Sequence, residues 1–375
     1  MGKTILDYET AELLDDVNKI RIIDQTQLPG RIECIELETA KQFWDAIYLL
    51  QVRGAPAIGV FAGFAIYLLT KETGLPKEDT RENRAENFAA LRAAFEKNKD
   101  YLNSSRPTAV NLSWALCRME KVFLSCGEND RLTMREIVER LHEECVAIRN
   151  EDVEVCRRIG ENGLALVKPG DGLLTHCNAG QLATIRYGTA TAPMYLGHER
   201  GYNFHIYCDE TRPLLQGARL TAFELSSAGM DVTLECDNMS ASLMKTGKVQ
   251  AVFVGCDRVA SNGDAANKIG TSLLALAAKY YGVPFYVCAP TSTIDMSLQT
   301  GDEIPIEQRK PEEVTEMWYE KRMAPEGIKV YNPAFDVTDH TLITGIVTEY
   351  GVARAPYTTS LREIFAKKTQ NDASI

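Results

Sequence analysis

Three groups that can give or take a proton lie at or just after the ends of short apolar runs. Cys177 follows GLLT in THCNAG, Asp209 ends HIYCD, and Asp257 follows AVFVG in GCDRVASNGD. A thiol and carboxylates gathered in one crevice can act as general acids and bases. Each residue also has an ordinary structural alternative, because cysteine is often a small buried apolar residue and aspartate often caps a turn or helix. Their joint placement at strand ends favours a shared site.

Three cations lie beside turns. Arg53 in VRGAPAIG and Arg106 in SSRPTAVN each directly precede a Gly or Pro turn that opens an apolar helix. Lys268 in NGDAANKIG is expected in the first turn of a helix, where it opposes the helix dipole unless an anion lies nearby. A solvated surface position is the alternative for each of them. In an acidic chain, however, three such cations indicate one shared anion such as a phosphate.

The elements that must hold these residues change in type near residue 150. From 151 to 375, short β-rich runs alternate with helical segments, which predicts a Rossmann-like, doubly wound and mostly parallel sheet. Ligands of such sheets bind beyond the carboxyl ends of the strands. Helices are expected over 178–201 and 267–282, and a frayed tail after Phe365. The expected strands are 172–176, 204–208, 231–235, 251–255, 284–289 and 342–348.

The first part, residues 1–150, is predicted to be a helical domain with a small antiparallel sheet. Strands are expected over 20–27 and 31–37. Apolar residues recur every three or four positions in the later segments, which predicts helices. The charged stretch 71–86 is expected to be a solvated loop and helix start. The predicted helices are 39–51, 56–71, 84–99, 107–124 and 134–149.

Composition excludes several classes of function. A net charge of -11 and a pI near 5.2 argue against a nucleic-acid partner. The most apolar run, 54–69, is shorter than a membrane span and contains Pro56, so we expect a buried helix and no membrane association. No secretory signal or myristoylation pattern opens the sequence, and its ten cysteines form no C-x-x-C or C-x-x-H pair. No dinucleotide or P-loop signature follows a strand. We therefore expect a cytoplasmic protein without metal or cofactor.

Several long motifs occur in a fixed order: RGAPAIG, RPTAVNL, THCNAG, DETRPLLQGARLTAFEL, CDNMSASLM, VGCDRVASNGDAANKIGT and APTSTID. Together they closely resemble the methylthioribose-1-phosphate isomerases over about residues 17–360. That family shares its fold with ribose-1,5-bisphosphate isomerases and with the regulatory alpha, beta and delta subunits of the eukaryotic exchange factor for translation initiation. The resemblance implies a homodimeric aldose–ketose isomerase of a 5-substituted ribose 1-phosphate, acting in salvage of 5'-methylthioadenosine.

The resemblance also implies roles for individual residues. Cys177 and Asp257 match the family's proposed acid–base pair. Its phosphate contacts carry over to the RGAP and RPT turns, the glutamine of LLQGAR and the Asn-Lys of ANKIGT. In this sequence the implied substrate-binding residues are Arg53, Gly54, Ala55, Arg106, Gln216, Asn267 and Lys268.

The implied substrate explains why such a pair is needed. A furanose locked by its C1 phosphate has no free aldehyde, so the ring must open before or during transfer of hydrogen from C2 to C1. One group must exchange a proton at the ring oxygen and another near C2. A helix start beside Cys177 would lower the thiol pKa, and an apolar crevice would raise that of Asp257. Proton and hydride transfer both remain open, and neither requires a metal.

One departure from the family pattern leaves the 5-substituent open. Ile185 and Arg186 stand before Tyr-Gly-Thr, where the family often has small residues. On a helix starting near Ala179, Arg186 is expected to face outward or form a salt bridge, leaving an apolar 5-pocket. The alternatives are 5-deoxyribose 1-phosphate and ribose 1,5-bisphosphate as substrates. A non-catalytic sugar-phosphate or nucleotide sensor is a further alternative, but it would not need both Cys177 and Asp257.

Overall fold

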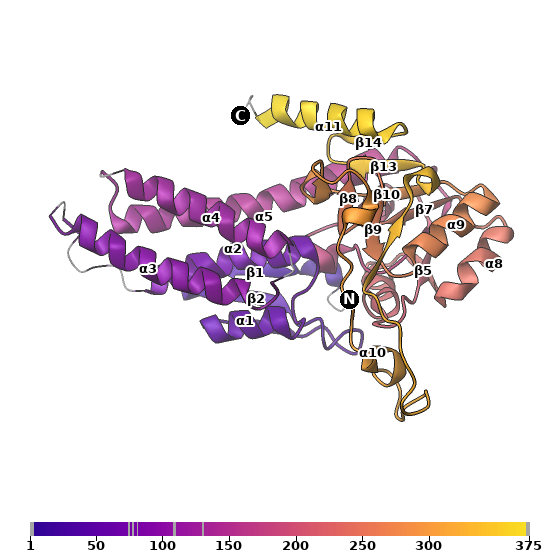
Figure 1. Ribbon diagram of the computed structural model, residues 1–375, viewed down its shortest axis with the longest axis horizontal. Coiled ribbons are helices and arrows are strands. Elements are labelled where there is room, and N and C mark those ends of the chain that lie inside the picture. The colour runs from indigo at the N-terminus through magenta and orange to yellow at the C-terminus, as the bar shows by residue number, and fades with distance from the viewer. Residues whose placement is uncertain are drawn as a thin grey trace. The chain divides into compact units, whose positions relative to one another are not determined.

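The computed structural model describes residues 4–372, apart from 74–75, 77–78, 81, 108–109 and 130. The chain forms two compact units (Figure 1). The helical unit comprises Met1–Glu154 and the short segment Leu182–Arg186. The sheet unit comprises Val155–Gln181 and Tyr187–Ile375. The short segment therefore packs with the helical unit although the chain on both sides of it belongs to the sheet unit.

The helical unit has the expected helices and antiparallel sheet. The helices are α1 (Ala40–Tyr48), α2 (Ala55–Glu72), α3 (Arg84–Asn103), α4 (Val110–Glu128) and α5 (Met134–Leu164), whose last residues enter the sheet unit. The strands are β1 (Ala11–Leu14), β2 (Lys19–Ile23) and β3 (Cys34–Leu37), in that order. Strand β1 was not predicted, because it is short and acidic residues flank its alternating apolar residues, Ala11 and Leu13. The predicted loop within 71–86 lies partly outside the described residues.

Helix α2 is the core helix of this unit. By length and composition alone it could cross a membrane, but 78% of its most apolar window is buried inside the protein. Phe61 on α2 meets the ring of Phe43 edge to face, with centroids 5.9 Å apart. The rings of Phe95 and Phe123 stack with centroids 4.5 Å apart. The apolar run is therefore a buried helix, as expected.

The sheet unit contains the expected doubly wound sheet. Its strand order is β14-β13-β10-β7-β4-β5-β6, and neighbours are parallel except β13 and β14. These strands are β4 (Gly172–Thr175), β5 (His205–Asp209), β6 (Asp231–Glu235), β7 (Ala251–Val254), β10 (Phe285–Cys288), β13 (Gly345–Thr348) and β14 (Gly351–Ala353). The helices are α6 (Ala192–Glu199), α7 (Ala222–Ser227), α8 (Ser240–Lys245), α9 (Thr271–Tyr281), α10 (Glu312–Thr315) and α11 (Tyr357–Asp372).

The order of the strands defines where a ligand should bind. From β4 the chain moves outward to β5 and β6, and then returns to β7 on the opposite side of β4. The direction of winding therefore reverses between β4 and β7. In open parallel sheets, the crevice beyond the carboxyl ends of the strands at such a reversal is the usual ligand site.

Three predictions about local structure were wrong. No helix spans 178–201, because Cys177, Tyr187 and Gly188 have positive φ angles and the chain loops back to Ala179 before α6 begins. Lys268 ends a strand, β9 (Ala265–Lys268), rather than opening a helix. That strand belongs to a second sheet with β8 (Arg258–Ala260), β11 (Ile294–Asp295) and β12 (Phe335–Thr338). Finally, α11 continues past Phe365 to Asp372.

Candidate active site

Cys177 and Asp257 lie on the loops that follow β4 and β7, the strands at the reversal. The two loops pack closely, because a Cβ atom on Gly255 would lie only 2.5 Å from Cβ of Ala179. Residue 255 must therefore lack a side chain for the loops to approach. The sequence-based expectation that strand ends bring these residues to one edge of the sheet agrees with this arrangement.

The turn that carries Cys177 has a defined backbone. Cys177 has φ 63°, a left-handed conformation that is uncommon for a residue with a side chain. Its N–H donates to Oγ1 of Thr211 at 2.8 Å, and its carbonyl accepts from the hydroxyl of Thr221 at 2.6 Å. The residues after it form a loop and a short 3-10 turn (Gln181–Ala183), so the expected α-helix start beside the thiol is absent.

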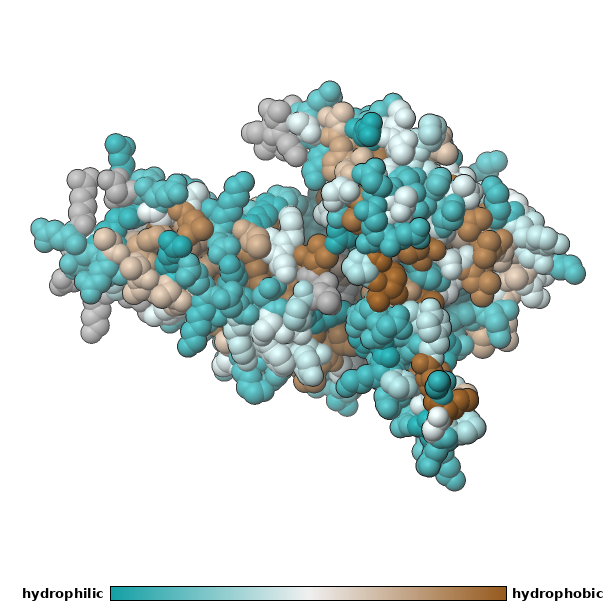
Figure 2. All heavy atoms as spheres, in the orientation of Figure 1, coloured by the Kyte–Doolittle hydropathy of each residue, from teal (hydrophilic) through white to brown (hydrophobic). Residues whose placement is uncertain are grey.

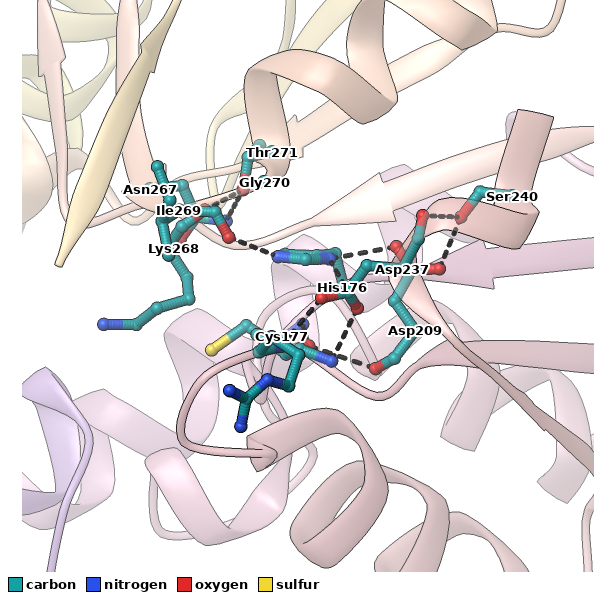
Figure 3. A network of polar contacts seen from close by, with 12 residues as sticks. His176, Cys177, Asp209, Asp237, Ser240, Asn267, Lys268, Ile269, Gly270 and Thr271 are labelled. Atoms are coloured by element: carbon teal, nitrogen blue, oxygen red, sulfur yellow. Dashed lines mark hydrogen bonds and ion pairs between the residues drawn. The ribbon is translucent and has the colours of Figure 1, made fainter. Parts of the chain in front are cut away.

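A buried polar network joins this turn to its neighbours (Figure 3). His176 is fully buried, with Nδ1 2.9 Å from Oδ2 of Asp209 and Nε2 2.9 Å from the carbonyl oxygen of Ile269. The hydroxyl of Ser240 donates to the other oxygen of Asp209 at 2.6 Å. Asp209 is thus the partner of a histidine, and His176 is a residue that the sequence analysis passed over. The sequence feature that could have identified His176 is its position directly after an apolar strand and directly before Cys177.

Asp257 is connected to the residues expected to bind phosphate. Its N–H donates to the carbonyl oxygen of Ala266 at 2.9 Å, directly before Asn267 and Lys268 in β9. The Asp257 residue is exposed, whereas the sequence led us to expect it in an apolar crevice. Figure 3 shows the side chains of Cys177 and Lys268 extending toward the same open side of the network.

Three predicted phosphate ligands belong to the sheet unit. Gln216 is 8% exposed, and its Oε1 has no hydrogen-bond partner among the described residues. Nδ2 of Asn267 donates to Oγ1 of Thr271 at 3.1 Å. Nζ of Lys268 lies 4.3 Å from the ring centroid of Phe335. The ammonium group of Lys268 can donate to an anion, whereas the buried carboxamide oxygen of Gln216 can accept a hydrogen bond from a ligand hydroxyl.

The other predicted phosphate ligands belong to the helical unit. Arg53 and Gly54 precede α2, which Ala55 opens, and Arg106 precedes α4. A Cβ on Gly59 would lie 3.1 Å from the carbonyl oxygen of Asn111, so the starts of α2 and α4 adjoin. The RGAP and RPT turns therefore lie at the same end of this unit. Gly54 has φ 92°, and a Cβ there would come within 2.4 Å of Cα of Ala183.

Arg186 differs from the expectation. It lies on a loop rather than a helix and is partly buried. No carboxylate of the described residues forms an ion pair with it. The helix from which the sequence argument placed this guanidinium does not form, and the salt-bridge alternative was wrong.

Two groups of side chains in the described part of the chain are close enough to share a cation: His176 with Asp209 and Asp237, and His340 with Asp264 and Asp339. In the first group, the oxygens of Asp237 accept the N–H groups of Thr211 and Arg212. Both oxygens of Asp209 also have donors. These hydrogen bonds already use the atoms that would bind a metal.

Comparisons with known proteins agree with this fold. The model of the initiation factor 2 subunit family matches residues 51–355. A methylthioribose-1-phosphate isomerase of Symbiobacterium thermophilum is 59% identical over 358 residues, which cover 95% of this chain and 96% of that protein. A 5-deoxyribose 1-phosphate isomerase of Petrotoga mobilis is 54% identical over 348 residues, 93% of this chain and 96% of that one. The crystal structure of 5-methylthioribose 1-phosphate isomerase from Pyrococcus horikoshii OT3 has a TM-score of 0.87 and 42% identity, covering 96% of each chain.

The fold defines an α/β protein with a doubly wound sheet whose direction of winding reverses between β4 and β7. The chain belongs to the initiation factor 2 subunit family, in which its similarity to sugar-phosphate isomerases extends over nearly its full length. The family resemblance expected from the motifs is confirmed.

Proposed function

We propose that the protein is an aldose–ketose isomerase that converts 5-methylthioribose 1-phosphate into 5-methylthioribulose 1-phosphate. The observation that carries this proposal is the placement of Cys177 and Asp257 after neighbouring strands at the reversal of the sheet. The similar proteins from Symbiobacterium thermophilum and Pyrococcus horikoshii OT3 are named methylthioribose-1-phosphate isomerases, which supports the choice of substrate. A sensor of sugar phosphates would need the anion site but not a thiol and a carboxylate beside it.

In the proposed reaction, Cys177 and Asp257 exchange protons with the sugar. One gives a proton to the ring oxygen as its bond to C1 breaks, and the other accepts a proton from C2 or from the C2 hydroxyl. If the hydrogen on C2 leaves as a proton, it or another proton returns to C1. If it moves as a hydride, only the hydroxyl proton leaves. Either route yields the C2 ketone with no net gain or loss of protons or electrons, so no cofactor is consumed.

The C1 phosphate is proposed to contact Gln216, Asn267 and Lys268 from the sheet unit, and the RGAP and RPT turns of the helical unit through Arg53, Gly54, Ala55 and Arg106. The support is local. The buried Oε1 of Gln216 lacks a donor, which a sugar hydroxyl would supply, while the amide nitrogen of Gln216 is the group that would donate to a phosphate oxygen. Lys268 is partly buried beside an aromatic ring, where an anion would gain a charge-assisted hydrogen bond.

The direct test is incubation with 5-methylthioribose 1-phosphate while following the ketose product by NMR. We expect wild-type turnover, and a Cys177→Ser variant at least about a hundredfold slower, because a hydroxyl cannot ionise near pH 7. Absence of product from the folded wild-type protein would refute the proposed substrate. Unchanged turnover after alkylation of Cys177 would remove the thiol from the mechanism.

A second substrate is favoured by a specific observation. The similar protein from Petrotoga mobilis is named a 5-deoxyribose 1-phosphate isomerase. 5-Methylthioribose has two more heavy atoms at C5 than 5-deoxyribose, the sulfur and its methyl carbon. Their burial corresponds to roughly 1–2 kcal/mol, so both sugars can be substrates. Comparison of kcat/KM for these two sugars and ribose 1,5-bisphosphate decides between them. A preference for the bisphosphate would indicate that a cation such as Arg186 faces the 5-substituent.

The protein is further proposed to act as a cytoplasmic homodimer in salvage of 5'-methylthioadenosine, without nucleic-acid or membrane partners. Hydrophobic side chains lie at the surface over α9 (Figure 2). Leu273, Leu276 and Tyr280 are 63%, 54% and 82% exposed, and their spacing puts them along one helix face. A second copy would cover such a face. Sedimentation at micromolar concentration showing only the 41.7 kDa chain would contradict the dimer.

A further inference from the structure

The two ring nitrogens of His176 both face acceptors. Oδ2 of Asp209 lies 2.9 Å from Nδ1, and the carbonyl oxygen of Ile269 lies 2.9 Å from Nε2. A neutral imidazole has one N–H, so one of these buried contacts would set a lone pair against an oxygen. When Asp209 is ionised, only the imidazolium satisfies both contacts. His176 and Asp209 therefore form a buried ion pair, which Ser240 completes by donating to the second oxygen of Asp209.

The protonation state agrees with the charges around the ring. Burial alone would lower the pKa of His176, but the hydrogen bond and charge of Asp209 outweigh it and raise that pKa. Asp237, with Oδ1 4.0 Å from Nδ1, also raises the pKa of His176. The charge of His176 in turn acts to lower the pKa of Asp336 on β12. The acidic groups that face the ring from its neighbours thus all favour the cation.

The same histidine joins two turns. Its backbone leads directly into Cys177, and its ring bonds the carbonyl between Lys268 and Gly270. Gly270 has φ 102°, and a Cβ there would lie 2.9 Å from Cε1 of His176. The turn after β9 is therefore packed directly on the imidazolium. Thr211 and Asp237 fix the other side of the Cys177 turn through backbone N–H groups.

We propose that His176 is a positioning residue for the isomerase reaction. Its buried imidazolium, held by Asp209, fixes the turn of Cys177 against the turn that follows Asn267 and Lys268. This inference rests on the proposed function for its effect on turnover. Its effect on the thiol can be measured without any substrate.

The test replaces His176 with a neutral residue and measures the thiol directly. In His176→Gln, Asp209 loses its counter-ion, and its unbalanced negative charge disfavours ionisation of the thiol on the nearby Cys177 turn. We expect the pH midpoint of Cys177 alkylation by iodoacetamide, followed on the Cys177 peptide by mass spectrometry, to rise by about one pH unit or more. The exposed Cys117 of the helical unit is an internal control whose midpoint should not move.

Kinetics provide the second readout. With 5-methylthioribose 1-phosphate, His176→Gln should lower kcat at least about tenfold, as expected for a misplaced catalytic group, and raise KM several-fold as the Lys268 turn loosens. His205→Gln is the matched control. It disrupts another histidine–aspartate pair at the start of β5, with Asp231, and should leave kcat and KM unchanged.

The outcomes separate the two proposals. If wild-type protein does not turn over the sugar phosphate, the proposed function fails, while the alkylation measurement still tests the inference. A folded His176→Gln variant with the wild-type alkylation midpoint would overturn the inference, even if its activity or stability fell. If that variant does not fold, Asp209→Asn replaces it. We then expect activity to fall as pH rises through the lowered pKa of His176, and an unchanged pH profile would overturn the inference.

Discussion

The helical unit and the sheet unit solve different packing problems. The core of the helical unit is almost entirely apolar, since helices satisfy their own backbone groups and present apolar stripes to each other. The sheet unit buries charged side chains such as His176, Asp209 and Glu224 at 0–1% exposure. Each of them lies at or near the carboxyl ends of β4 and β5. Buried polar groups there must be hydrogen-bonded, so they fix loop geometry as well as stability.

The backbones differ in the same way. In the sheet unit, Cys177, Thr211 and Leu215 have φ angles of 63°, 67° and 57° on the loops after β4 and β5. Such conformations cost about 1–3 kcal/mol each and persist where surrounding contacts hold them. In the helical unit, the non-glycine residues with positive φ angles, Asn18 and Leu50, lie in connections between elements. Strain therefore collects where the proposed chemistry takes place.

The largest expected effect breaks the helical core and leaves the site intact. Phe95 is fully buried and stacks on Phe123. Phe95→Ala should lower the free energy of unfolding by about 3–5 kcal/mol, because it removes apolar contacts and leaves a cavity. Chemical denaturation measures this loss, and kcat of the remaining folded protein should stay within about twofold. A large fall in kcat would show that the helical core also sets the geometry of catalysis.

The second prediction acts in the opposite sense. Asp257→Asn should lower kcat by at least about a hundredfold while substrate still binds, because the amide cannot exchange the proton. Denaturation should show little change, since Asp257 is exposed. Glu36→Gln in the helical unit is the control; it removes a surface carboxylate paired with Arg21 and should affect neither quantity by much. Full activity in Asp257→Asn would assign the proton transfer to another group.

Long periodic segments explain which parts of the fold could be predicted. The helices from α1 to α4 and the strands β4, β6 and β7 follow from apolar spacing, and their ends agree closely with the structure. Strands β8 (RVA) and β9 (AANK) could not be predicted, because both are short and their pairing depends on residues distant in the sequence. The loop 178–191 was mistaken for a helix because its small residues fit helical spacing while its positive φ angles leave no mark on that pattern.

For the site, sequence motifs identified the residues at the strand ends but not their support. Cys177 and Asp257 stand out by position. The partnership of His176 with Asp209 and Ile269 depends on three segments meeting in space, which no local pattern records. The exposure of Asp257 and the partial burial of Arg186 were likewise decided by tertiary contacts.

The third prediction measures how tightly the His176 ring is packed. Gly270→Ala should be more destabilising than Gly282→Ala by about 1 kcal/mol or more, although both glycines have positive φ. A Cβ at 270 meets His176, while a Cβ at 282 meets nothing within 4 Å. Denaturation of the two variants isolates the cost of that contact. Gly270→Ala should also lower kcat, whereas Gly282→Ala should not, and equal effects of the two changes would show that His176 tolerates displacement.

The smallest effect concerns a charge in the helical unit. Oδ2 of Asp152 accepts the N–H of Ile185 at 2.8 Å, which holds the short segment Leu182–Arg186 on α5. Burial raises the pKa of Asp152 to about 7, against the opposing effect of that hydrogen bond. Between about pH 4 and 7 the unfolded chain therefore releases a proton that the folded protein keeps, so the stability contributed by this group is lost as pH rises. Because the residue is only partly covered, we expect Asp152→Asn to be more stable than wild type by about 1 kcal/mol at pH 8 and equal to it at pH 4.

Asp15 in the same unit provides a control of opposite sign. Burial acts to raise its pKa, but hydrogen bonds from Tyr67 and Lys71 lower it overall. Asp15→Asn should therefore lose stability relative to wild type above about pH 4, with the difference vanishing under more acidic conditions. Denaturation of both variants and the wild type across this range compares the two carboxylates directly. If Asp152→Asn shows no gain in stability at pH 8, the Asp152 carboxylate is solvated in the folded protein. The short segment Leu182–Arg186 is then held by its apolar contacts and by the hydrogen bond from Gln25 to the carbonyl of Leu182, rather than by a group that titrates near neutrality.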